Sequence, residues 1–260
     1  MYMRLLQVKV KPEGLELARD YYESTVVPRL RTIKGCQFAR LIQNRSEPSN
    51  IISMTLWENQ EDAEAYQKSP VYEQLMAEFS DFLDESSVWK IQLSEKMELE
   101  YKPETEEPVI QAFPVTTQKN LLTPETCKPS PLFVRIVSHK IQKGKMGEFR
   151  TLYRKEVIPT LEKTRGCCSA YLMENMQNGE EIISITIWEN HLAAEDYEKS
   201  GQFQHLIDKV KHCYTKLYQW KMALSEESRE QAKTSDDMKI DHYKVVSGQE
   251  FKSGPTKNRT

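Results

Sequence analysis

Apolar and polar positions follow a pattern that predicts the order of strands and helices. Residues 3–10 alternate between apolar and polar, as in a half-buried strand, and residues 14–33 carry apolar side chains at helical spacing. Two more alternating segments follow at 36–44 and 50–57, then a second helical stretch, then a strand at 88–97. The order βαββαβ is typical of a ferredoxin-like α+β fold.

The same pattern occurs twice. The segment "TLWENQEDAEAYQKS" beginning at Thr55 returns as "TIWENHLAAEDYEKS" beginning at Thr186, and 186 − 55 gives an offset of 131 positions. The alignment extends without a gap over about 90 residues, and about a third of the aligned pairs are identical. A period of this length is too long for a solenoid, so we interpret it as a duplicated domain.

Composition divides the chain into four parts. Residues 1–97 and 131–227 form the two repeats. Residues 98–130 contain five prolines and the run "ETEE", so they predict an extended, mostly irregular linker, with "VIQAFPV" as a candidate edge strand. Residues 228–260 are polar and predict a disordered tail, with "DHYKVV" as a candidate docking segment.

The strand at 50–57 has two distinct faces. Ile52, Met54 and Leu56 form an aliphatic face, which we expect to pack against the helices. The other face is mixed, and we expect it to meet the other repeat; it consists of Ile51, Ser53, Thr55 and Trp57. A sheet with helices on one face needs a partner on the other. The two repeats therefore predict an intramolecular dimeric α+β barrel, a pseudo-dimer within one chain.

Short-range signals mark where the helices begin and end. Pro28 should kink or restart the first helix, and Gly35 should end it. Asn59 stands where the second helix needs an N-cap, and Ser69 followed by Pro70 predicts that this helix is in two pieces.

Charge and cysteine content exclude several functions. The net charge of −3 gives no support to nucleic-acid binding. No apolar run is long enough for a membrane span, and the alternating N-terminus does not look like a signal peptide. The five cysteines lack metal-type spacing, so we expect reduced thiols in a cytoplasmic protein with no metal site, and Cys36 and Cys167 as packing residues.

The repeated motifs resemble those of the antibiotic biosynthesis monooxygenase (ABM) family. The matching features are "TLWEN" or "TIWEN" at a strand end, "YQKS" or "YEKS" on the next helix, "KGC" or "RGC" after the first helix, and "KPEG" after the first strand. The resemblance implies dimeric α+β barrels whose members include cofactor-free oxygenases of aromatic compounds and haem-degrading monooxygenases. It identifies the fold better than the reaction.

The haem-degrading branch implies a pocket with an Asn, a Trp and a His ligand. The Asn position holds Gln7 or Ser138, and the Trp position holds Tyr66 or Tyr197. The His position holds Leu75 or Met76 in the first repeat and Leu206 or Ile207 in the second, so the ligand pattern is not matched. His205 is the nearest histidine, and only the second repeat can offer it as a haem ligand.

We therefore expect an ABM-type monooxygenase that oxidises a small aromatic or haem-like substrate in a pocket between helices and sheet. The alternatives are a non-catalytic barrel that binds a ligand or partner, and a haem-degrading enzyme that uses the second repeat alone. The expectation is no cofactor, with haem as the alternative, and a further homo-oligomer is left open. No catalytic residue is assigned. The expected substrate-binding residues are Gln7, Trp57, Tyr66, Ser138, Trp188 and Tyr197.

Overall fold

A computed structural model shows an α+β chain that divides into two compact units. It describes residues 1–84, 87–93, 99–105, 109–120, 132–174, 180–215 and 238–251. The first unit is built on the first repeat and the second unit on the second repeat. The first comprises Arg4–Gln43, Glu47–Gln111 and Ser247–Thr260, and the second comprises Met1–Met3, Asn44–Ser46 and Ala112–Val246.

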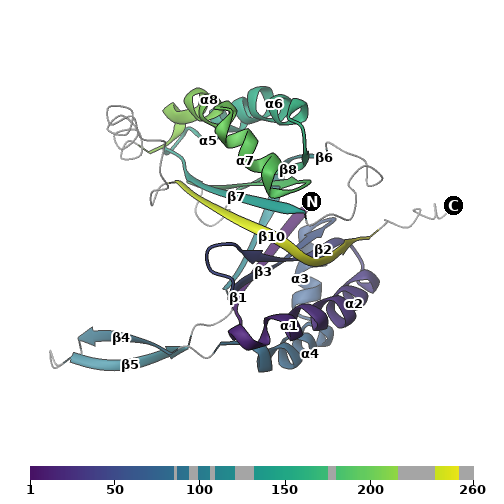
Figure 1. Ribbon diagram of the computed structural model, residues 1–260. Coiled ribbons are helices and arrows are strands. Elements are labelled where there is room, and N and C mark those ends of the chain that lie inside the picture. The colour runs from purple at the N-terminus through teal and green to yellow at the C-terminus, as the bar shows by residue number, and fades with distance from the viewer. Residues whose placement is uncertain are drawn as a thin grey trace. The chain divides into compact units, whose positions relative to one another are not determined.

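The first unit has a three-stranded sheet with helices on one face (Figure 1). Its strands lie in the order β1-β3-β2, and β2 and β3 pair antiparallel. The strands are β1 (Tyr2–Lys9), β2 (Cys36–Asn44) and β3 (Asn50–Trp57). The helices are α1 (Leu15–Tyr21), α2 (Val27–Thr32), α3 (Gln60–Gln67) and α4 (Pro70–Phe79), with 3-10 turns at Pro12–Gly14 and Ser80–Phe82.

The second unit repeats this order and adds a strand at each edge of the sheet. Its strands lie in the order β10-β7-β9-β8-β6. They are β6 (Val109–Asn120), β7 (Phe133–Lys140), β8 (Cys167–Glu174), β9 (Glu181–Trp188) and β10 (Met238–Glu250). The helices are α5 (Met146–Leu152), α6 (Ile158–Lys163), α7 (His191–Lys199) and α8 (Gln202–Val210), followed by the 3-10 turn η5 (Lys211–Cys213).

The predicted break at Pro28 takes the form of a π-helical turn. α1 continues through the π turn η2 (Tyr22–Val26) into α2, where the N–H of Val27 donates to the carbonyl of Tyr22. Proline has no N–H and its ring clashes with the carbonyl four residues earlier, and the wider turn removes that conflict. The second repeat has the same π turn, η4 (Tyr153–Val157), before Pro159.

The predicted caps are confirmed. The side chain of Asn59 accepts a hydrogen bond from the N–H of Asp62 at 2.8 Å, and α3 begins at the next residue. Ser69 accepts from the N–H of Tyr72 at 3.3 Å, and Pro70 opens α4. Each bond satisfies a backbone donor that has no partner within its own helix.

The expected orientation of β3 is wrong. Ile51, Ser53 and Thr55 face the helices, whereas Ile52 and Met54 are buried on the opposite face. The physical reason is a polar contact, because the hydroxyl of Tyr22 on the first helix needs a partner and finds Ser53 at 3.0 Å. The second repeat confirms this orientation, with Tyr153 and Ser184 at 2.8 Å.

Parts of the expected linker and of the expected disordered tail form strands. The candidate edge strand "VIQAFPV" lies within β6, which pairs with β8. The candidate docking segment lies within β10, which pairs antiparallel with β7 and buries Tyr243. A disordered tail is therefore wrong for 238–250, because this segment completes a ladder of backbone hydrogen bonds.

The strand predicted to close the first repeat does not join its sheet. β4 (Ser87–Leu93) pairs instead with β5 (Leu99–Thr105) as a separate two-stranded sheet. Only a few residues connect β4 and β5, so bringing the two strands together costs little loop-closure entropy. The counterpart strand near Trp220 lies outside the described residues.

The face-to-face packing of the two repeats stays a prediction. Within the described residues, no helix combines the length and the apolar character needed to cross a membrane.

Candidate functional site

A cavity lies in the first unit between the sheet and the helices. It encloses about 50 Å³, and about 530 Å³ of empty space when the part open to solvent is included. Most of its walls are aliphatic or aromatic, as in small-molecule sites. Tyr72 and Met76, one turn apart on α4, are half-buried. The full lining is Arg4, Leu6, Val8, Tyr22, Val26, Leu30, Leu41, Ile51, Ser53, Thr55, Tyr66, Tyr72, Leu75, Met76 and Phe79.

Arg4 is the charged residue in this lining. Its exposed fraction is 2%. The guanidinium carbon lies 4.7 Å from the ring centre of Tyr72 and 5.8 Å from that of Tyr66. Its Nε and Nη2 atoms are buried, and no acceptor in the described part of the chain bonds to them. The cavity thus contains a positive charge that aromatic rings contact and that no carboxylate of the described residues neutralises.

Buried tyrosines supply hydroxyl groups to the same cavity. Burial raises the pKa of Tyr22 above its ordinary value of 10.0, although its hydrogen bond with Ser53 acts in the opposite direction. Burial also raises the pKa of Tyr66, although the charge of Arg4 lowers it. Both phenols therefore stay protonated at neutral pH and can donate hydrogen bonds.

Of the residues predicted for the first repeat, Tyr66 lines the cavity and Gln7 does not. Gln7 is exposed on the face of β1 opposite to Leu6 and Val8, so its predicted role in this cavity is not supported by its position. Trp57 is fully buried behind Tyr66, with ring centres 5.1 Å apart. Its indole N–H donates to Thr55 at 2.9 Å, so its polar atom is satisfied inside the core.

The predicted residues of the second repeat are arranged in the same way. Trp188 is fully buried, lies 5.0 Å from Tyr197 between ring centres, and donates to Thr186 at 2.9 Å. Ser138 is half-buried, between two β7 neighbours, Val137 and His139, whose side chains belong to the other face. Trp188 and Tyr197 thus form a packed pair, and Ser138 does not join them.

The second repeat differs from the first at its buried arginine. Arg135, at 3% exposure, occupies the position of Arg4 and donates through Nε to the carboxylate of Glu198. His242 on β10 also contacts Glu198, at 3.1 Å. Burial alone would raise the pKa of Glu198, but the bond from His242 and the charge of Arg135 bring it down to about 2. The Glu198 carboxylate therefore stays ionised and neutralises the Arg135 charge.

His139 occupies the position that Val8 holds in the first repeat. It is 5% exposed, and its ring stacks on Tyr214 at 5.1 Å between centres. Burial, with a further contribution from Arg135, lowers its pKa to about 3. His139 is therefore neutral in the folded protein at all ordinary pH values.

The residues present do not fit haem ligation. His205 is exposed on α8, and it is absent from the lining of the first-repeat cavity. It is equally absent from the lining of a surface hollow of about 400 Å³ that lies beside α7. In the first repeat the ligand position holds Leu75 and Met76, and the side-chain wall there is apolar.

Burial rather than reactivity characterises the cysteines of the described residues. Cys36, Cys167, Cys168 and Cys213 are all buried, so the predicted packing role of Cys36 and Cys167 is supported. Burial raises the pKa of Cys36 to about 12. A thiol with this pKa is not a nucleophile at neutral pH.

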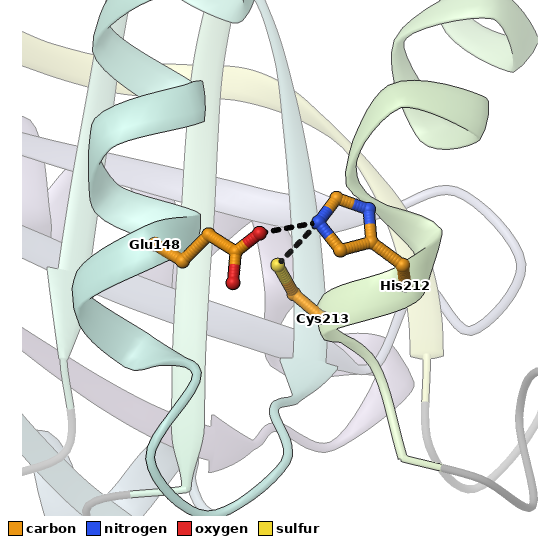
Figure 2. A group of neighbouring side chains, drawn as sticks. All are labelled: Glu148, His212 and Cys213. Carbon is orange, nitrogen blue, oxygen red and sulfur yellow. Dashed lines mark hydrogen bonds and ion pairs between the residues drawn. The ribbon is translucent and has the colours of Figure 1, made fainter.

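Figure 2 shows a cluster of metal-ligand type in the second unit, formed by Glu148 of α5 with His212 and Cys213 of η5. His212 Nε2 lies 2.8 Å from Glu148 and 3.5 Å from the sulfur of Cys213. Lys145 contacts the second carboxylate oxygen of Glu148 at 2.6 Å. The carboxylate is already paired with an ammonium group and hydrogen-bonded to the histidine, so the cluster is explained as an ion-pair network.

Comparison with known proteins assigns the family. The family model for antibiotic biosynthesis monooxygenase matches residues 1–78 and again residues 132–209. These matches cover more than half of the chain, and the chain belongs to this family. The tandem arrangement predicted from the repeat is thereby confirmed. No curated protein matches the sequence.

Solved structures support the same fold over both repeats. A candidate monooxygenase from Fusobacterium nucleatum subsp. nucleatum matches with a TM-score of 0.68 at 9% identity, covering 96% of this chain and 94% of its own. A candidate monooxygenase from Lactobacillus acidophilus NCFM gives 0.64 at 7% identity, covering 96% and 95%. An anthrone oxidase-like protein gives 0.55 at 11% identity, covering 96% and 93%. At these low sequence identities, the similarity shows a shared fold and does not assign a reaction.

Proposed function

We propose that the first repeat is a cofactor-independent monooxygenase that oxidises a small, electron-rich aromatic compound. The observation that carries the proposal is the cavity of the first unit, where aromatic rings line one small space together with a guanidinium group that has no carboxylate partner among the described residues. Membership of a monooxygenase family supports the reaction class. The second repeat serves as the structural counterpart.

The reaction needs a substrate that can itself reduce dioxygen. A phenol whose para carbon carries hydrogen loses its hydroxyl proton, and the phenolate transfers one electron to O₂. The resulting radical and superoxide combine into a peroxide at the para carbon. Loss of water from this peroxide leaves a quinone, so that phenol and O₂ give benzoquinone and H₂O. One oxygen atom enters the product and the other leaves as water.

The residues of the cavity can promote the first of these steps. A positive guanidinium in a water-poor site stabilises a phenolate more strongly than water does, since the local dielectric is low and the dipoles are fixed. Arg4 supplies this charge, and the protonated hydroxyl of Tyr66 can donate to the same oxygen. The aliphatic wall of Leu6, Leu30 and Leu75 excludes water from the peroxide.

Entry of a ring requires movement at the mouth of the cavity. The enclosed 50 Å³ is smaller than the roughly 150 Å³ apolar cavity that accepts benzene in another protein. Met76 is the adaptable side chain at this place, because an unbranched thioether changes rotamer easily. Its neighbour Tyr72 is also half-buried and can move with it.

Oxygen uptake tests the proposal. With an electron-rich phenol as substrate, wild-type protein should consume O₂, and Tyr66→Phe should slow the rate about 10- to 100-fold by removing a donor to the phenolate. Tyr197→Phe is the matched control in the second repeat and should leave the rate within about twofold. Rates are followed with an oxygen electrode and quinone absorbance.

Two outcomes would contradict the proposal. Equal losses in Tyr66→Phe and Tyr197→Phe would show that the first repeat is not the working site. Saturable binding of phenols without any oxygen uptake would identify the cavity as a binding site of a non-catalytic barrel, the alternative expected from the sequence.

A further inference from the structure

The two repeats bury equivalent arginines in different electrostatic surroundings. Arg4 and Arg135 are aligned, and Glu198, which pairs with Arg135, aligns with position 198 − 131 = 67. That position holds Gln67, an uncharged residue whose side chain is exposed at the end of α3. The first repeat has therefore kept the buried cation and lacks its carboxylate.

An unpaired buried guanidinium is costly. Moving a charge out of water is repaid only by an opposite charge and by hydrogen bonds to its donors. The rings of Tyr66 and Tyr72 attract the Arg4 charge, but Nε and Nη2 have no acceptor within the described part of the chain. In Arg135 the Nη2 atom is also unpaired, but its Nε donates to Glu198 and the charges cancel. An anionic oxygen beside Arg4 would neutralise its charge and accept hydrogen bonds from Nε and Nη2.

We propose that Arg4 binds the anionic oxygen of an aromatic ligand, a carboxylate or a phenolate. In the second repeat the carboxylate of Glu198 takes the place of this ligand anion beside Arg135. The chain then binds one such ligand, in the first repeat. This inference rests on the proposed function, because it places the ligand in the cavity proposed as the substrate site. The substrate is then an anion, and each chain has one site for it.

The ring of the ligand fits the surroundings of that charge. Tyr66 and Tyr72 meet edge to face with centres 5.4 Å apart, and both contact Arg4. A planar ligand whose anion meets the guanidinium therefore contacts at least one aromatic face. The half-buried Ser53 supplies a further hydroxyl on the sheet side of the cavity.

Calorimetric titration without oxygen tests the charge of the ligand. The probes are benzoate and benzamide, which have nearly the same shape and differ in charge. Benzoate should bind about 10- to 100-fold tighter than benzamide, because a charge-assisted hydrogen bond to a buried group exceeds a neutral one by this factor. The stoichiometry should be one per chain. 4-Nitrophenol separates the two anions, since a shift of its colour towards the ionised form on binding shows that phenolates are also accepted.

Three variants locate the site. Arg4→Met should lower benzoate affinity to the level of benzamide. Gln67→Glu places a carboxylate where the second repeat has one; it keeps Arg4 and should weaken benzoate at least tenfold by internal competition. The control is Arg135→Met/Glu198→Gln, which removes the pair of the second repeat together and should leave benzoate affinity unchanged.

Equal affinities for benzoate and benzamide would overturn the proposal, as would two sites per chain or an unaltered benzoate affinity in Gln67→Glu. The last variant retains Arg4, so its result does not depend on tolerance of a lost arginine. Binding in the absence of oxygen is independent of turnover. If benzoate binds as expected and no phenol is oxidised, the proposed reaction is wrong and the anion site is supported. If phenols are oxidised but benzoate binds no better than benzamide, the anion site is wrong and the proposed reaction is supported.

Discussion

Replacing Glu198 with alanine is expected to lower the free energy of unfolding by about 3 kcal/mol. The reason is that Arg135, at 3% exposure, would keep its charge and lose the carboxylate that neutralises it. Removal of one partner from a buried pair typically costs 3–5 kcal/mol. The lower end applies because the side chain of Glu198 is 27% exposed. Chemical denaturation of the variant and wild type measures the difference.

Glu195→Ala provides the matched control on the same helix. Glu195 forms surface ion pairs with Lys199 at 2.9 Å and with Arg45 at 3.5 Å, so its loss should cost much less stability than the loss of Glu198. Combining Arg135→Met with Glu198→Ala removes both charges and should recover part of the stability that Glu198→Ala loses. A Glu198→Ala protein as stable as wild type would show that this pair does not neutralise a costly charge.

Mild acid should destabilise the second unit through His139. The unfolded chain protonates this side chain near its ordinary pKa of 6.5, whereas the folded protein keeps it neutral down to about pH 3. The unfolded state therefore binds one more proton between these values. Stability from this group is complete above pH 6.5 and is lost as the pH falls below it, by about 3 kcal/mol in all between pH 8 and pH 4.5.

His139→Val isolates this effect, because valine is the residue that the first repeat holds at the same position, Val8. The difference in unfolding free energy between wild type and variant should shift by about 3 kcal/mol between pH 8 and pH 4.5. The carboxylate of Glu198 does not interfere, since its lowered pKa affects stability only below its ordinary value of 4.5. Parallel pH profiles for the two proteins would show that His139 titrates alike in both states.

The order of elements was predictable because its signals are local. Asn59, Ser69 and Pro70 mark helix starts through bonds to residues within three positions, and alternation marks the strands. Pro28 signals an interruption of the first helix, but a π turn differs from a kink by one backbone hydrogen bond, which the residue types do not specify.

The orientation of the sheet was not predictable from alternation. A period of two shows that Ser53 and Thr55 share a face, but not which face meets the helices. We expected the aliphatic face to do so because it is more apolar. The buried hydroxyl of Tyr22 decides otherwise, since it needs the polar side chain of Ser53. A tyrosine on the apolar side of a helix was the available signal.

The candidate site was predictable only in part. Tyr66 was identified through the family resemblance and does line the cavity. Arg4 was not predicted. A signal for it is present in the sequence, since both repeats hold an arginine, Arg4 or Arg135, at the same position of an otherwise apolar strand. The missing partner of Arg4 could not be predicted, since the pairing of Arg135 with Glu198 joins residues 63 positions apart.

Methyl NMR on selectively labelled methionines shows whether the cavity of the first repeat binds an anionic aromatic ligand. Met76 lines the cavity of the first repeat, and the aligned position of the second repeat holds Ile207. On titration with benzoate, the Met76 methyl resonance, assigned through Met76→Leu, should shift saturably with a ring-current change. Met173, buried on β8, should not move. A Met76 signal that stays unchanged at saturating benzoate would contradict a ligand site in this cavity.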